Sequence, residues 1–206
     1  MKNNNREWFN RNKGRYESSR KEFLDFITLL IAGLSTIEPG LSTLSAKDAV
    51  FRIYRDVRFS EDKSPYKTQM GAHMVSGGKK SGRAGFYFHL EPGGCFAGGG
   101  VWHPDPDRLR ILRKEIFGNI DEFKSIIGDR EFADVFGKIQ GEQLVNPPKG
   151  FPADHPDIGL LKFKSYTVFR EFPDSVILSA GARQAVLEAF RVMKPFNDFI
   201  NHAFDG

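Results

Sequence analysis

The stretch GFYFHLEPGGCFAGGGVWH, residues 85–103, decides the expected fold. Over residues 85–91 the side chains alternate between an apolar and a polar face, which is the period of a strand with one buried face. The apolar face holds Phe86, Phe88 and Leu90, and the polar face holds Tyr87, His89 and Glu91. Pro92 to Gly94 then turn the chain, and residues 95–103 return as a partner strand. The stretch therefore predicts an antiparallel hairpin.

The returning strand contains three consecutive glycines, Gly98, Gly99 and Gly100. Glycines pack no side chain of their own, so such a run is typical of a bulge or of close approach by another group. That group is expected to be a neighbouring helix, an aromatic ring such as Trp102, or a ligand.

Patterns on both sides of the hairpin extend it into a mixed fold. Apolar residues recur every three to four positions near both ends of the chain, which predicts a long helix over residues 16–34 and another over 180–202. Further strands are expected at 51–59, 66–76 and 163–170, and shorter helices at 107–117, 119–128 and 129–136. We expect a single α+β domain over residues 1–206, in which a mostly antiparallel sheet of hairpin-linked strands is bracketed by the two long helices.

The segment from Arg52 to Lys67 mixes charges, aromatic rings and residues that favour strands. If residues 51–59 form a strand, Arg55 shares the core-facing side with four apolar residues, Phe51, Ile53, Val57 and Phe59. A guanidinium on such a face is costly unless it is paired and hydrogen-bonded. The sequence therefore predicts that an internal carboxylate or a ligand satisfies Arg55.

An anion site on this segment is the candidate that the residues favour. Arginine binds carboxylate or phosphate bidentately, and lysine adds a compact positive charge. The polar face of the hairpin strand supplies groups that can donate or accept a proton. The candidate ligand-binding residues are Arg52, Arg55, Asp56, Arg58, Lys63, Tyr66, Lys67, Tyr87, His89, Glu91, Gly98, Gly99 and Gly100.

The same segment carries a resemblance to a known family. Its pattern runs Arg52-x-x-Arg55-Asp56-x-Arg58-Phe59 and continues as Asp62-Lys63-x-Pro65-Tyr66-Lys67, with Asn4 to Phe9 before it and Phe96 to His103 after it. This combination resembles the uncharacterised bacterial family catalogued as domain of unknown function 2461, and the likeness covers nearly the whole chain. The resemblance implies a soluble bacterial protein of this length, and it implies no activity, cofactor or catalytic residue.

Two other readings of the arginines remain open. In the first, the arginines pair with Asp56, Glu91, Asp105 or Asp107 in a purely structural network, and an amphipathic helix face contacts a protein partner. In the second, the basic first half binds nucleic acid. Residues 1–83 hold sixteen Lys and Arg against nine Asp and Glu, a balance of +7. Stacking surfaces for bases would be Tyr54, Phe59, Tyr66, Tyr87 and Trp102.

Other motifs are sparse. The turn SGGKKSGR, residues 76–83, lacks the spacing of a phosphate-binding loop and is expected to be a mobile, solvated tip. Cys95 is the single cysteine, which excludes an intrachain disulfide. A metal site built from His73, His89 and Glu91 is sterically conceivable, but no metal-binding motif is present, and we expect none. The sequence indicates no cofactor, no oligomeric state and no enzymatic motif. Without a signal segment or a membrane span, we expect a cytoplasmic protein.

Overall fold

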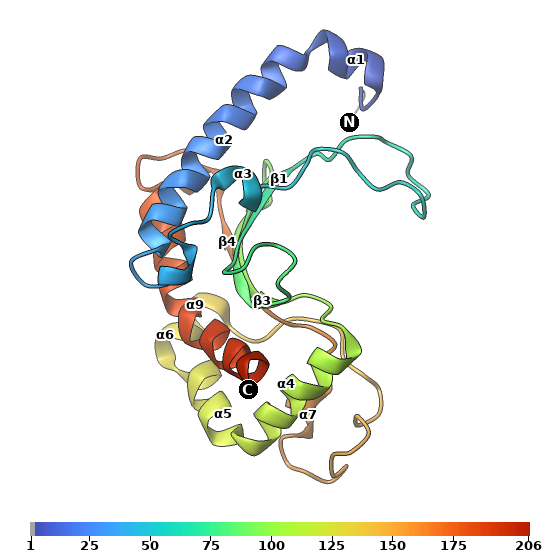
Figure 1. Cartoon of the computed structure of the whole chain (residues 1–206), viewed down its shortest axis with the longest axis vertical. Helices are drawn as coiled ribbons and strands as arrows, with labels where there is room; N and C mark the ends of the chain where they lie inside the picture. The colour runs from blue at the N-terminus through green and yellow to red at the C-terminus, as the bar shows by residue number, and fades with distance from the viewer. Residues whose placement is uncertain (1–2) are drawn as a thin grey trace.

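The computed structural model describes residues 3–206 and shows an α+β protein (Figure 1). Within these residues four strands form one antiparallel sheet in the order β1-β2-β3-β4. The strands are β1 (Met70–Met74), β2 (Gly85–Leu90), β3 (Cys95–Val101) and β4 (Tyr166–Phe172). The expected hairpin is therefore confirmed: Tyr87 lies opposite Gly98, and His89 lies opposite Phe96.

The two longest helices bracket the chain as expected. These are α2 (Lys13–Leu34) and α9 (Ala182–Asp205). The shorter elements are α1 (Arg6–Arg11), the 3-10 turn η1 (Pro39–Leu41), α3 (Ala46–Ala49), α4 (Pro106–Gly118), α5 (Ile120–Gly128), α6 (Arg130–Phe136), α7 (Ile158–Leu161) and α8 (Asp174–Ile177). No helix within residues 3–206 combines the length and the apolar character needed to cross a bilayer.

The apolar face of β2 packs against the long helices, as its alternation predicts. The ring of Phe88 lies 6.3 Å from that of Phe23 on α2, and the ring of Phe86 lies 5.3 Å from that of Phe190 on α9. All four rings are buried. The hydrophobic effect therefore holds α2 and α9 on one face of the sheet, and the other face carries Tyr87 and His89.

A buried asparagine ties α9 to the middle of the sheet. Asn197, only 2% exposed, accepts a hydrogen bond from the Gly100 N–H at 2.8 Å and donates one to the Gly85 carbonyl at 3.1 Å. One turn later, Asn201 bridges the N–H and carbonyl of Ala84 in the same way. These bonds satisfy backbone groups where the β2–β3 ladder ends.

Replacing Asn197 with leucine is expected to destabilise the protein by about 2 kcal/mol or more, because two buried backbone groups lose their partners. Urea unfolding of the variant measures this cost. Asn201→Ala provides a graded comparison, since Asn201 is only partly buried and water can replace its bonds. Equal stability of Asn197→Leu and the wild type would contradict the anchoring role.

The strand expected at residues 51–59 is wrong. Residues 51–69 form an arm that projects from the body beside α1 and the start of α2 (Figure 1). Its only ladder contacts within the described residues are isolated bridges, such as that of Tyr54 with Tyr66. The strand expected at 66–76 shortens to β1 for the same reason. The arm has no neighbouring strand to complete a ladder, and Phe59, placed on the core face by the alternation, is 94% exposed.

The tip of α1 holds the arm in place. The ring of Phe9 stacks on Tyr66 with centroids 4.1 Å apart. Asn4 donates to the Tyr66 carbonyl at 2.8 Å and accepts from the Tyr66 N–H at 3.2 Å. The N-terminal residues and the arm therefore form one contact, although about sixty residues separate them in the chain.

Candidate functional site

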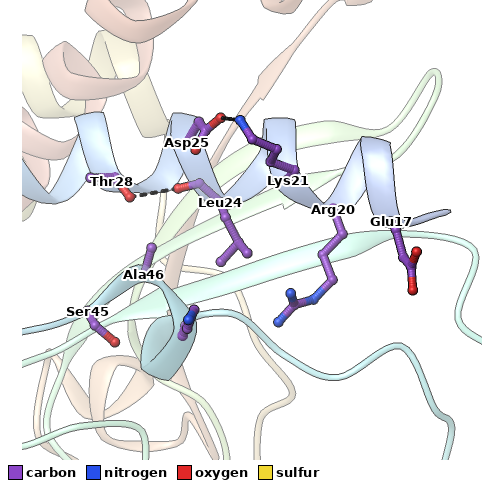
Figure 2. A pocket seen from close by; sticks show the side chains of 9 residues that line it. Glu17, Arg20, Lys21, Leu24, Asp25, Thr28, Ser45 and Ala46 are labelled. Carbon is purple, nitrogen blue, oxygen red and sulfur yellow. Dashed lines mark hydrogen bonds and ion pairs between the residues drawn. The ribbon is translucent and has the colours of Figure 1, made fainter. Parts of the chain in front are cut away.

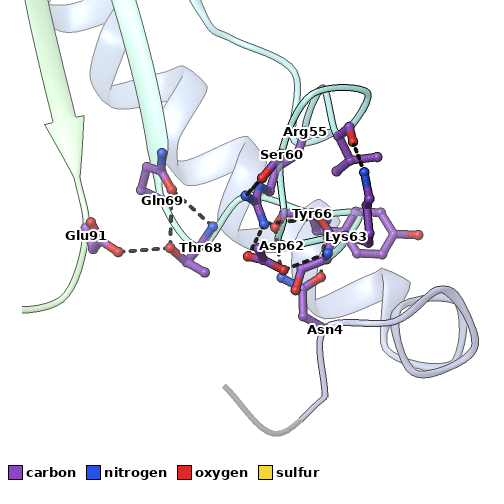
Figure 3. Close-up of polar contacts among 11 residues, drawn as sticks. Asn4, Arg55, Ser60, Asp62, Lys63, Tyr66, Thr68, Gln69 and Glu91 are labelled. Atoms are coloured by element: carbon purple, nitrogen blue, oxygen red, sulfur yellow. Dashed lines mark hydrogen bonds and ion pairs between the residues drawn. The ribbon is translucent and has the colours of Figure 1, made fainter.

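Two arginines of the arm pair with carboxylates of the arm itself, and Figure 3 shows one of these pairs, Arg55 with Asp62. The Arg55 guanidinium forms an ion pair with Asp62 and also donates to the Ser64 carbonyl at 3.3 Å and the Ser60 hydroxyl at 3.4 Å. The Arg58 guanidinium donates two hydrogen bonds to the Asp56 carboxylate, from Nε at 2.9 Å and from Nη2 at 2.7 Å. Arg55 thus has an internal carboxylate partner, as one of the two predicted alternatives required. That partner is Asp62, which is not among the four acids considered from the sequence.

The hydrogen bonds around Asp62 lower the pKa of its carboxyl group. Hydrogen bonds from Ser64, followed by the Arg55 contact, lower the pKa of Asp62 from 3.8 to about 2. Because the folded pKa is depressed, the contribution of this contact is complete above pH 3.8 and is lost as the pH falls through about 2. Carboxyl carbon NMR is expected to show Asp62 titrating near pH 2, and Ser64→Ala is expected to raise the midpoint. A midpoint near 3.8 in the wild type would contradict the network.

The remaining arm candidates point in different directions. Lys63 donates to the Val57 carbonyl at 3.0 Å, and Tyr66 is buried against α1. The Lys67 ammonium lies 5.3 Å from the centre of the Phe51 ring. Arg52 is exposed, and no carboxylate within residues 3–206 pairs with it. The structure therefore does not gather the arm's cations around one cavity.

On the face of the sheet opposite α2 and α9, a chain of hydrogen bonds links the polar residues of β2. Tyr87 Oη lies 3.1 Å from His89 Nδ1, and His89 Nε2 lies 3.2 Å from a Glu91 carboxylate oxygen. Thr68 donates to the other Glu91 oxygen at 2.9 Å. A carboxylate can only accept, so the contact with Glu91 favours the tautomer in which His89 Nε2 donates and Nδ1 accepts from Tyr87.

The pKa values along this chain agree with that arrangement. The hydrogen bond from His89, followed by that from Thr68, lowers the pKa of Glu91. Burial raises the pKa of Tyr87 and keeps its phenol protonated. With its proton directed at His89, the Tyr87 oxygen has lone pairs free to accept a hydrogen bond from a ligand.

Aromatic rings cover the same face. Phe96 stacks on His89 with centroids 4.6 Å apart, and it also contacts Tyr87 at 5.6 Å and Phe169 at 5.3 Å. Phe51, from the base of the arm, lies 6.2 Å from Tyr87. This aromatic layer is only half-buried, and among residues 3–206 the two long helices α2 and α9 pack on the opposite face.

The glycine triplet is shaped mainly by the protein itself. A side chain at Gly98 would overlap the ring of Phe169, and one at Gly99 would overlap Met193 of α9. Gly100 has a positive φ of 91° and lies against the Tyr166 carbonyl. Of the explanations considered, a neighbouring helix and an aromatic ring account for Gly99 and Gly98, and the ring is Phe169, not Trp102.

A pocket of about 590 Å³ opens over the aromatic layer, and we call it the open-face pocket. Three cations from two segments line it: Lys79 and Arg83 from the turn before β2, and Arg108 from α4. The remaining lining residues are Phe51, His73, Gly82, Gly85, Tyr87, Phe96, Gly99, Gly100, Val101, Trp102, His103, Pro104, Asp105, Thr167 and Phe169. Of the predicted site residues, Tyr87, Gly99 and Gly100 therefore line the pocket, whereas the arm's arginines and lysines do not.

The cations in the pocket are incompletely neutralised. Arg83 pairs with Asp205, and the nearest contact between Arg108 and Asp105 is 3.6 Å. The buried Nη1 atom of Arg108 has no hydrogen-bond partner within the described structure. The Lys79 ammonium donates to the Val50 carbonyl at 2.7 Å, and burial lowers its pKa. Lys79 therefore reaches the pocket without an ion-pair partner among the described residues, and Arg108 has only the long contact with Asp105.

Sequence reasoning missed these three cations. It treated residues 76–83 as a solvated tip, and it gave Arg108 no role. The signal available was the turn's own composition, two lysines and an arginine among glycines. The contact between this turn and α4 depends on tertiary packing. Arg108 of α4 lies against Gly82 of the turn and 5.0 Å from the Phe204 ring of α9.

The pocket also contains two histidines, His73 and His103. Burial, followed by the charge of Lys79, lowers the pKa of His73 to about 4, so this ring is neutral at physiological pH. Within residues 3–206 no three His, Cys, Asp or Glu side chains lie close enough to hold a metal ion. The arrangement offers positive charge and flat apolar walls, which suits an anion with a planar part.

Comparison with known proteins places the chain in a family. A family model described as a conserved hypothetical protein, DUF2461, matches residues 1–199, which include the arm, the whole sheet and most of α9. No curated protein and no solved structure matches the chain significantly. Since the family model spans nearly the full length, the chain belongs to the DUF2461 family of conserved hypothetical proteins.

Proposed function

We propose that the protein binds a small anionic ligand, carrying a phosphate or carboxylate group next to a planar unsaturated part, in the open-face pocket. The observation that carries the proposal is the convergence of Lys79, Arg83 and Arg108 on one aromatic-walled cavity. Charge-assisted hydrogen bonds from such groups are the strong ones in anion recognition. Pockets of this size, mostly apolar with a few convergent polar groups, are the usual form of small-molecule sites.

The aromatic layer supports the planar part of the ligand. The rings of Tyr87, Phe96 and Phe169 contact one another and stay half-buried within the pocket. Rings on a sheet face are normally covered by a packed element, and here a flat ligand would serve as the cover. The Tyr87 ring would contact that ligand, and the hydrogen bonds through His89 to Glu91 would fix the orientation of this ring.

The proposal moves the anion site from the arm to the sheet while keeping the base of the arm in it. Phe51 lines the pocket, and two ammonium groups lie near its ring. The Lys79 ammonium is 5.1 Å from the ring centre, and the Lys67 ammonium is 5.3 Å from it. Lys67 contacts the pocket only through Phe51, because it does not itself line the cavity. The buried free thiol of Cys95 fits the reducing cytoplasm that we propose as the location.

Melting temperatures measured with phosphate, organic acids and nucleoside monophosphates test this proposal. Adenosine monophosphate is expected to raise the melting temperature, because a ligand at a hundred times its Kd stabilises a protein by about 2.7 kcal/mol. Adenosine, which lacks the anion, is expected to have little effect. No stabilisation by any anion of the panel would contradict the proposal.

Neighbouring lysines provide the matched control. Lys79→Gln is expected to abolish most of the stabilisation by adenosine monophosphate, since it removes a pocket cation. Lys80→Gln makes the same change of charge in the same turn at a side chain that does not line the pocket, and it is expected to leave the stabilisation intact. Equal losses in both variants would show a non-specific charge effect.

A further inference from the structure

A second positively charged hollow lies on the opposite side of the arm, between α2 and α3. One part, about 580 Å³, runs from Glu17 to Thr28 on α2 and along residues 45–47 (Figure 2). A second part, about 290 Å³, continues to Arg52 and Tyr54 at the base of the arm. Arg20 and Lys47 line both parts, so the two hollows form one continuous groove, which we call the α2–α3 groove.

Acidic and basic residues are interleaved along this part of the sequence, but in the structure the acids near the groove pair with neighbouring residues. Lys13 pairs with Glu17 at 3.3 Å, and Lys21 pairs with Asp25 at 2.7 Å. Asp48 accepts a hydrogen bond from the Ser45 hydroxyl at 2.6 Å. The acids bordering the groove are therefore already engaged by neighbours on their own helices.

Three cations of the groove lack such partners. No carboxylate within residues 3–206 lies within ion-pair distance of Arg20, Lys47 or Arg52. Figure 2 shows Arg20 reaching from α2 toward α3, whereas Lys21 turns away and meets Asp25. These three residues thus form a line of positive charge along the groove that no carboxylate of the described residues neutralises.

Aromatic rings accompany these cations. Phe9, Tyr16, Phe51 and Tyr54 line the second part of the groove. Tyr54 is 55% exposed and Phe51 is 40% exposed, which is unusual for large rings beside a cavity. Alternation of free cations with exposed rings is typical of surfaces that bind single-stranded nucleic acid, where phosphates meet the cations and bases stack on the rings.

We infer that the α2–α3 groove binds single-stranded nucleic acid, with Arg20, Lys47 and Arg52 contacting phosphates and Tyr54 stacking on a base. The exposed rings favour a single strand, because a duplex keeps its bases stacked inside and an acidic peptide offers carboxylates without flat faces. This site is independent of the open-face pocket, since only Phe51 lines both.

Fluorescence anisotropy of a labelled oligothymidine of about 20 nucleotides tests the inference on the full chain. The triple variant Arg20→Glu, Lys47→Glu, Arg52→Glu is expected to bind at least about tenfold more weakly, and the slope of log affinity against log salt is expected to shrink by about 2. Tyr54→Ala is expected to weaken binding at least about fivefold. Lys79→Gln is expected to leave this binding unchanged.

A matched triple variant controls for net charge. Lys114→Glu, Lys138→Glu and Lys149→Glu reverse three exposed lysines that lie outside the groove and form no ion pair with any described residue, and this variant is expected to keep wild-type affinity. Equal weakening in both triple variants, or undiminished binding by the groove variant, would overturn the inference. So would tighter binding of duplex DNA or equal competition by polyglutamate. If the groove variant does not fold, Arg52→Glu alone, at an exposed arm position, decides by the same comparison.

Discussion

Replacing Gly100 with alanine is expected to destabilise the protein by about 3 kcal/mol or more. Gly100 has a φ of 91°, which strains any residue with a side chain. A Cβ atom at this position would lie 1.9 Å from the Tyr166 carbonyl oxygen and 3.0 Å from the Phe196 ring. The neighbouring strand β4 would have to move, and this movement would also break the hydrogen bond that Gly100 donates to Asn197.

Urea unfolding of Gly100→Ala measures that loss, and Gly118→Ala is its control. Gly118 is the last residue of α4, and a Cβ there would meet no atom within 4 Å. The control is expected to be neutral or to stabilise the protein slightly, because alanine lowers the entropy of the unfolded chain. A cost below about 1 kcal/mol for Gly100→Ala would contradict the tight contact between β3 and β4.

Lowering the pH from 7 to 4 is expected to reduce the free energy of unfolding by about 3 kcal/mol through His73 alone. The folded pKa of His73 is about 4, below its ordinary 6.5, because burial and then Lys79 disfavour the charged ring. The unfolded state therefore binds the proton first. The stabilising contribution of the neutral ring is complete above pH 6.5 and is lost as the pH falls toward 4.

Unfolding curves at several pH values, with His73→Gln as the comparison, measure this effect. The variant is expected to lose most of the pH dependence between 6.5 and 4.5, a window above the range in which the depressed carboxylates Asp56 and Asp62 titrate. Lys79→Gln is expected to raise the pKa of His73, which proton NMR of the imidazole ring detects. A His73 pKa near 6.5 in the wild type would contradict the burial of this ring against the pocket.

The local pattern was enough to predict the hairpin and the long helices. Alternation in residues 85–91 reports directly which side of β2 is buried, because a strand has only two faces. The same rule failed for residues 51–59, where an alternation interrupted only by Arg55 produced no strand. Alternation shows only that a segment is suited to a sheet. To become a strand, the segment also needs a neighbouring strand, and within the described residues the arm forms only isolated bridges.

The candidate site was only partly predictable, for a related reason. Tyr87 and the glycines of β3 were identified because their positions are local features of one hairpin. Lys79, Arg83 and Arg108 meet only after the turn before β2 packs against α4, and no spacing in the sequence encodes that contact. The partner of Arg55 was missed because the arm folds back on itself and brings Asp62 to it.

The most direct test of the open-face pocket is an NMR titration of the isotope-labelled protein with adenosine monophosphate. The account predicts saturable shifts of the amides of Lys79, Gly85 and Gly100, which surround the pocket, with none at Arg55 or Asp62 in the arm. Shifts confined to the arm, or no saturable shift at any of these amides, would contradict it.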